Sequence, residues 1–133
     1  MANTITVHVN QTSPSTSEGI VRQHRVLIDR PVEKGGEDQG AMGGELLLVA
    51  LGGCFMSTLL AAIRAREAAI TDVRVEIAGT LDGNPPRFTA IAMQVSGNYD
   101  DHDQMSKLVT IAERSCIVAN TLRDAVELTF TVK

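Results

Sequence analysis

The segment from Leu46 to Ile63 constrains the fold most, because it holds eighteen consecutive residues without a charge. As a helix it would be about 27 Å long, which is borderline for crossing a bilayer. Gly52, Gly53, Ser57 and Thr58 dilute its hydrophobicity, and the charges that flank it show no clear positive-inside asymmetry. We therefore expect a helix buried inside a protein, not a membrane span.

A helix that is apolar on all sides must be buried on all sides. One sheet built from the rest of a 133-residue chain cannot surround it, whereas a second copy of the chain could. The composition therefore predicts an intimate homodimer with this helix near its centre. Gly52 and Gly53 each cost about 1 kcal/mol relative to Ala in a helix. Either another backbone approaches closely there, or space is left beside Cys54, or the glycines simply allow helix–helix contact.

The remaining chain alternates between extended and helical patterns and fits one domain over residues 1–133. A glycine-rich loop covers residues 30–44, and DGNPP (82–86) predicts a hairpin turn. In the strand after this turn Phe88 and Ile91 are in opposite phase, which predicts a bulge near Thr89–Ala90. A helix capped by Asp100, Asp101 or Asp103 follows, and its apolar stripe extends to Cys116. The fold class is therefore α+β. Strands are expected at 3–9, 19–29, 71–81, 87–99 and 125–132.

Composition excludes several function classes. A net charge of −4 without any run of Lys or Arg disfavours nucleic-acid binding. The first residues lack the pattern of a signal peptide, so we expect a cytoplasmic protein with reduced thiols. His8, His24 and His102 are isolated, and the glycines before Ala41 lack the Lys and Ser or Thr of a phosphate-binding loop. We expect no metal and no cofactor.

The two cysteines, Cys54 and Cys116, lie 62 positions apart and each falls on or beside the apolar face of a predicted helix. Unpaired cysteines often act as small buried hydrophobic residues. Alternatively, the two form a redox pair, in which one thiolate attacks a peroxide oxygen, becomes a sulfenic acid and condenses with the second thiol. That chemistry needs a lowered thiol pKa, usually from a nearby cation or a helix N-terminus.

Four stretches occur in an order and spacing that resemble the OsmC/Ohr family of thiol-dependent organic hydroperoxide reductases. They are RPVEKGGEDQG, ELLLVALGGCF, PPRF and AERSCIVANTL, and the resemblance runs from about Gly19 to Val132. It implies an intertwined homodimer with two long central helices wrapped by antiparallel sheets, and active sites at the subunit interface. It also implies that Cys54 is the peroxidatic cysteine and Cys116 the resolving one, with a dithiol such as a lipoylated protein as reductant.

The chain departs from the peroxidases of this family at the residues that activate the thiolate. Those peroxidases carry Glu ten residues before the peroxidatic cysteine, where this chain has Gly44. Glu45, one position later, is the candidate acidic residue for activating the thiolate. The partner Arg of that family has no counterpart by motif. The candidates that could replace it from the partner subunit are Arg22, Arg25 and Arg30.

The leading hypothesis is a peroxiredoxin-like, antioxidant, stress-response oxidoreductase that reduces organic hydroperoxides with Cys54 and Cys116. The alternative is a non-peroxidatic dimer of the same fold that binds a small apolar or thiol-bearing ligand at the subunit interface. A third hypothesis is a dimeric scaffold with two inert thiols.

Overall fold

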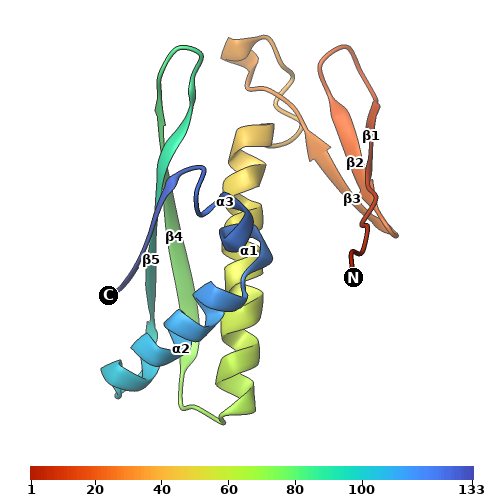
Figure 1. The fold of residues 1–133 in the computed structure, drawn as a ribbon. Coiled ribbons are helices and arrows are strands. Elements are labelled where there is room, and N and C mark those ends of the chain that lie inside the picture. Colours follow the sequence, from red (N-terminus) through yellow and green to blue (C-terminus); the bar gives the residue numbers. More distant parts are fainter. The chain divides into compact units, whose positions relative to one another are not determined.

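A computed structural model describes all residues, 1–133, as two compact units, Met1–Leu47 and Leu48–Lys133 (Figure 1). The expectation of one domain over residues 1–133 stays a prediction.

The first unit is a small antiparallel sheet followed by a glycine-rich loop. The single extended segment expected over residues 19–29 is wrong, because the chain reverses at Arg22, whose φ is +53°, so that Val21 pairs with His24. Neither Arg22 nor Gln23 is a typical turn residue, so the sequence pattern did not predict this hairpin. The strand order is β1-β2-β3. The elements are β1 His8–Gln11, β2 Ser17–Val21, β3 His24–Ile28 and the short 3-10 helix η1 Val32–Lys34.

Asp29 organises the loop that follows β3. Its buried carboxylate accepts hydrogen bonds from the Thr16 hydroxyl at 2.8 Å and from the Arg30 N–H at 2.7 Å. The N–H groups of Glu37 and Gln39 also donate to it, each at 3.2 Å. Burial alone would raise the pKa of Asp29, but these hydrogen bonds outweigh it and lower the pKa to about 2.

The second unit holds a three-stranded sheet in the order β4-β5-β6 and most of the long helix α1. β4 and β5 form the expected antiparallel hairpin, whereas β6 joins β5 in parallel, so this sheet is mixed and not antiparallel throughout as the resemblance implied. Two helices separate β5 from β6, and such a crossover lets the chain return in the same direction. The elements are α1 Gly43–Ala65, which begins in the first unit, β4 Thr71–Asp82, β5 Arg87–Asn98, α2 His102–Ser115, α3 Ile117–Leu122 and β6 Glu127–Val132.

Two local predictions for this unit are confirmed. The bulge lies where it was expected, because Thr80 pairs with Ala90 and Leu81 with Phe88, which leaves Thr89 as the extra residue. The side chain of Asp101 accepts the N–H of Gln104 at 3.0 Å and so caps α2.

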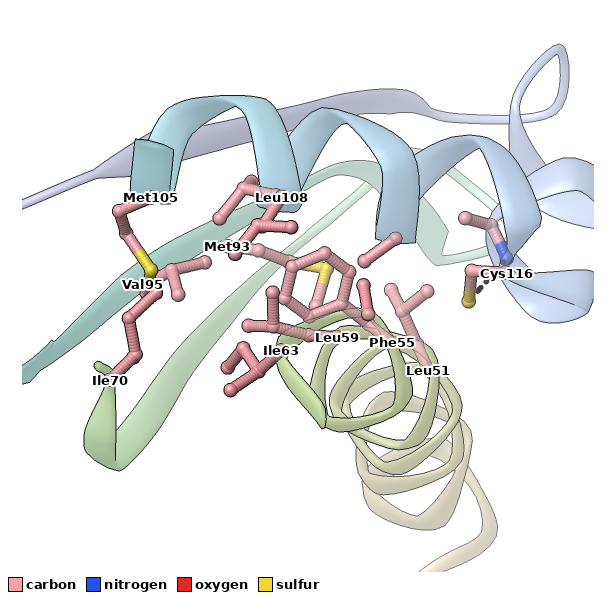
Figure 2. Packing of buried hydrophobic residues seen from close by; sticks show 14 of the residues in the cluster. Leu51, Phe55, Leu59, Ile63, Ile70, Met93, Val95, Met105, Leu108 and Cys116 are labelled. Atoms are coloured by element: carbon pink, nitrogen blue, oxygen red, sulfur yellow. Dashed lines mark hydrogen bonds between the residues drawn. The ribbon is translucent and has the colours of Figure 1, made fainter. Parts of the chain in front are cut away.

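The core of the second unit forms where α1, α2 and β5 meet (Figure 2). Phe55 of α1 is fully buried, and its ring centre lies 5.1 Å from that of Phe130 in β6. The other members are aliphatic or sulfur-containing, as the scarcity of aromatic residues requires. The largest fully buried side chains are Phe55, Leu51, Leu59, Ile91, Met93, Met105, Leu108, Val95 and Cys116.

One face of α1 packs into this core and the other is exposed in the single chain. Val49 is 62% and Leu60 44% exposed, and the small residues Gly53 and Ser57 lie at the same helical spacing between them. By length and composition alone α1 could cross a membrane, with a mean hydropathy of 2.3, but the core helix of a globular protein passes the same test.

The adjacent glycines of α1 have different surroundings. A Cβ at Gly52 would overlap Cδ1 of Ile77, so this glycine lets α1 lie close to β4. A Cβ at Gly53 would meet nothing within 4 Å. A close approach therefore explains Gly52, whereas the space at Gly53 lies open on the exposed side of the helix.

Candidate functional site

The two cysteines come from separate helical elements of the second unit. Cys54 lies in α1 and is partly buried against the core, while Cys116 is fully buried. The apolar stripe predicted that the second helix extends to Cys116, but Cys116 lies outside α2. Its extended backbone, with φ −79° and ψ 114°, ends α2 at Ser115 and starts α3 at Ile117.

Three hydrogen bonds fix Cys116 at this junction. Its N–H donates to the Glu113 carbonyl at 3.3 Å, and its own carbonyl accepts the N–H of Asn120 at 2.9 Å. Its Sγ accepts the N–H of Ala119 at 3.4 Å, which makes the thiol the N-cap of α3 (Figure 2). The backbone on both sides therefore holds the sulfur in place.

The first turn of α3 also lies against Cys54. Burial raises the pKa of the Cys54 thiol, but hydrogen bonds from the Val118 N–H, the Cys116 thiol and the Ile117 N–H together lower it below its ordinary value. For Cys116 burial dominates and, with the neighbouring Cys54, raises the pKa despite the Ala119 N–H. Of the two thiols, Cys54 therefore ionises more readily than Cys116.

The opposite pKa shifts of the two thiols suit a two-thiol redox pair. A thiolate is the nucleophilic form of cysteine, and a neighbouring thiol can later condense with the oxidised sulfur. The structure therefore brings together the two cysteines that the sequence singled out, whereas their roles in a reaction stay predictions.

The amides of Ile117 and Val118 lower the pKa of Cys54 and were not among the residues predicted from the sequence. The apolar stripe predicted one helix through to Cys116, without a new helix N-terminus there. The usable signal was Cys116 itself, since a small polarisable side chain directly before IVANTL occupies an N-cap position.

Glu45 serves as a helix cap. Its carboxylate accepts the Met42 N–H at 2.8 Å, in the manner of the third-position residue of a capping box. Its predicted part in activating the thiolate of Cys54 is untested, since Glu45 belongs to the first unit.

The three candidate arginines also belong to the first unit. Arg22 forms the β2–β3 turn, Arg25 pairs with Glu18 at 2.6 Å in an exposed salt bridge, and Arg30 donates its N–H to Asp29. Cys54 belongs to the second unit, and their role in activating its thiolate stays a prediction. No group of three or more His, Cys, Asp or Glu side chains is placed to hold a metal ion.

Solved structures similar to this chain share its fold across nearly the whole length. An OsmC-like protein of unknown function from Vibrio cholerae has a TM-score of 0.81 and 13% identity, and covers 99% of this chain and 100% of its own. The organic hydroperoxide resistance protein OsmC from Legionella pneumophila gives a TM-score of 0.75 at 18% identity, with coverage of 100% and 98%. OhrB, an organic hydroperoxide resistance protein of Bacillus subtilis, gives 0.70 at 18% identity, with 98% of both chains covered.

No curated protein sequence matches the chain. The family model described as OsmC-like protein matches residues 36–131, a range that includes both cysteines and every element from α1 nearly to the end of β6. The α+β arrangement and this match agree with the resemblance seen in the sequence motifs. The chain belongs to the OsmC-like protein family.

Proposed function

We propose that this protein is a thiol-dependent peroxidase that reduces organic hydroperoxides, with Cys54 as the peroxidatic and Cys116 as the resolving cysteine. The observation that carries the proposal is the placement of both thiols at the start of α3, where the pKa of Cys54 is lowered and that of Cys116 raised. Among the similar structures, those of Legionella pneumophila and Bacillus subtilis are organic hydroperoxide resistance proteins, which supports the substrate class.

The reaction runs in three balanced steps. The Cys54 thiolate attacks the outer peroxide oxygen, the O–O bond breaks, and the leaving alkoxide takes a proton to give an alcohol. The resulting sulfenic acid condenses with the Cys116 thiol to form a disulfide and water. A dithiol, such as the dihydrolipoyl group of a lipoylated protein, then reduces the disulfide and becomes a cyclic disulfide itself.

The amides of Ile117 and Val118 contribute to the first step. They stabilise the negative charge on the Cys54 sulfur without a charged side chain. This contribution is independent of the Glu that Gly44 replaces, and it supports peroxidase activity in a chain without that residue. Glu45, Arg22, Arg25 and Arg30 are further candidates for activating the thiolate, within the subunit or from a partner.

The active form in this proposal is a homodimer in the cytoplasm. The exposed side of α1, which carries Val49, Gly53, Ser57 and Leu60, offers an apolar surface with small residues at its centre. A second copy of the same helix would cover it, which supports the intertwined dimer. Reduced thiols are required at rest, and the cytoplasm supplies the reducing conditions that maintain them.

The alternative is a dimer of the same fold that binds a small apolar or thiol-bearing ligand without reducing a peroxide. Gly44 at the position of the Glu of the peroxidases favours it. The same assay separates the two functions, because a binder would retain the ligand without consuming the peroxide.

The test follows the loss of cumene hydroperoxide in the presence of dihydrolipoamide. We expect the wild type to turn over and Cys54→Ser to lose activity. Cys116→Ser is expected to turn over more slowly than the wild type, since the sulfenic acid cannot be resolved within the chain and must condense with dihydrolipoamide directly. Equal rates for the three proteins would contradict the proposal. Mass spectrometry of the oxidised wild type should find the Cys54–Cys116 disulfide.

A further inference from the structure

Thr58 links α1, which carries Cys54, to α2, which ends directly before Cys116. It lies in α1, one turn after Cys54, and its hydroxyl oxygen is 3.0 Å from the Ala112 carbonyl oxygen of α2. The same hydroxyl is 2.8 Å from the Phe55 carbonyl and 3.4 Å from that of Cys54 within its own helix. Because a hydroxyl has one proton, these three carbonyls share a single donor.

The three carbonyls need that donor to different degrees. Phe55 and Cys54 lie inside α1, where the helix itself supplies an N–H four residues on. Ala112 lies in the last turn of α2, and the N–H of Cys116, which would be its donor, turns to Glu113. Ala112 is fully buried, so water does not replace the lost donor. The Thr58 hydroxyl therefore matters most to the Ala112 carbonyl.

The two residues joined by this hydrogen bond are each four positions from a cysteine. Cys54 precedes Thr58 by four residues, and Cys116 follows Ala112 by four. A contact so close to the pair sets the distance between α1 and the end of α2, and with it the position of Cys116 opposite Cys54. Core packing of Leu108 and Ala112 holds α2 in general, whereas the hydroxyl holds its last turn.

We propose that Thr58 is a positioning residue for disulfide formation, which holds the last turn of α2 so that Cys116 can attack the sulfur of Cys54. This inference rests on the redox pairing of the proposed function, but its geometry can be tested without a peroxide. Thr58 does not touch either sulfur in this proposal, and it acts only through the Ala112 carbonyl.

The test loads Cys54 with an aromatic disulfide, 5,5′-dithiobis(2-nitrobenzoate). The Cys54 thiolate attacks one sulfur of the reagent, a mixed disulfide forms, and one thionitrobenzoate anion leaves. Cys116 then attacks the Cys54 sulfur, loses its proton to solvent and releases the second anion as the protein disulfide forms. The first phase reports the reactivity of Cys54, and the second reports its approach to Cys116. Cys116→Ser, which should release only one anion, assigns the phases.

In Thr58→Val, which keeps the shape but lacks the hydroxyl, we expect the second phase to slow about tenfold. This factor corresponds to about 1.4 kcal/mol, the size expected of one hydrogen bond. The first phase should stay within about threefold of the wild type, since the change leaves the Cys54 sulfur and the α3 amides in place. Thr58→Ser, which restores the hydroxyl, should restore the second phase.

Thr110→Val is the matched control. The Thr110 hydroxyl donates at 3.1 Å to Ser106 within α2 and is exposed, so its loss should change neither phase. Thr58→Ala provides a second variant without the hydroxyl should the valine chain fold poorly. The proposal is overturned if folded Thr58→Val or Thr58→Ala forms the disulfide as fast as the wild type, or if Thr110→Val slows it equally. Loss of peroxidase activity with normal two-phase release would instead contradict only the proposed function.

Discussion

Cys116 acts on Cys54 in two ways, as a hydrogen-bond donor and as the cap of the helix whose amides face the same sulfur. Its thiol helps to lower the pKa of Cys54, and its own sulfur accepts the Ala119 N–H. Serine keeps a donor and is a good N-cap, whereas alanine offers neither. The two substitutions therefore separate the polar function of this residue from its volume.

The first prediction concerns the ionisation of Cys54. In Cys116→Ala, the pH midpoint for alkylation of Cys54 by iodoacetamide should rise relative to the wild type, because a donor and a helix cap are lost. In Cys116→Ser it should stay below the alanine midpoint. Mass spectrometry of quenched samples measures the rate at each pH. An alanine variant with the wild-type midpoint would contradict the hydrogen-bond account of this thiolate.

The second prediction concerns Asp29, whose pKa is lowered to about 2 from 3.8. A carboxylate with a depressed folded-state pKa stabilises the fold above pH 3.8, and this contribution is lost as the pH falls from 3.8 towards 2. Urea unfolding of Asp29→Asn should therefore depend less on pH across this window than that of the wild type. Asp124→Asn, at an exposed position, should keep the wild-type dependence. A parallel fall in stability for Asp29→Asn and the wild type would contradict the prediction.

At the residue scale, sequence reasoning identified the sulfur atoms but not the groups that tune them. Cys54 and Cys116 could be selected because cysteines are few and their context resembles a known family. The amides of Ile117 and Val118 belong to a helix of six residues, too short to show a periodic pattern. Arginines were the predicted activators of the Cys54 thiolate, whereas the backbone amides of Val118 and Ile117 are among the causes of its lowered pKa.

At the scale of the elements, α1 has two faces with different tasks. Leu51, Phe55 and Leu59 form the face that packs on the sheet and α2, and the opposite face holds exposed Val49 and Leu60. An apolar helix face left in water is unfavourable by about 25 cal/mol for each Å² that could be buried. The pattern of small residues on this face favours a close helix–helix contact.

The third prediction tests this face. Leu60→Arg places a charge on the exposed side of α1, where Leu60 is 44% exposed. If that side is the dimer interface, the substitution should convert the dimer to a monomer in light scattering, because an unpaired charge would be buried there. Leu81→Arg, at a 65% exposed apolar position of β4, is the control and should leave the molecular mass unchanged. A monomeric wild type, or a dimer in both variants, would contradict the prediction.

The elements that sequence reasoning recovered are those whose pattern is local. Alternation predicted β4 and β5, the phase change between Phe88 and Ile91 predicted the bulge, and the absence of charge predicted α1. The β2–β3 turn at Arg22 was missed because a non-glycine residue adopts a positive φ there. The parallel pairing of β6 with β5 depends on how the chain crosses over, which no local pattern encodes.

At the scale of the whole molecule, the α+β class followed from the order of the elements, and the family from motifs spread over most of the chain. The match over residues 36–131 confirms the family. The division into two compact units, Met1–Leu47 and Leu48–Lys133, was not predicted, since their boundary falls inside the continuous apolar helix α1, which has no linker-like composition there.

The fourth prediction concerns the stability of the whole chain in its two redox states. A disulfide between Cys54 and Cys116 would close a loop of 62 positions, for which loss of chain entropy in the unfolded state corresponds to about 4 kcal/mol. Bond formation also ties the sulfur that accepts the Ala119 N–H to Cys54, and weakening of this cap offsets part of the gain. We expect the oxidised protein to resist urea better than the reduced protein, by more than zero and less than about 4 kcal/mol.

Equilibrium unfolding of both redox forms at one protein concentration measures this difference, because association would otherwise shift the apparent stability. Cys116→Ser exposed to the same oxidant cannot form the bond and should show no gain. The redox state of Cys54 and Cys116 would then also affect the stability of the second unit, since Cys116 lies in its core and Cys54 packs against it. An oxidised form less stable than the reduced one would mean that strain at the α2–α3 junction exceeds the entropic gain, and would contradict the prediction.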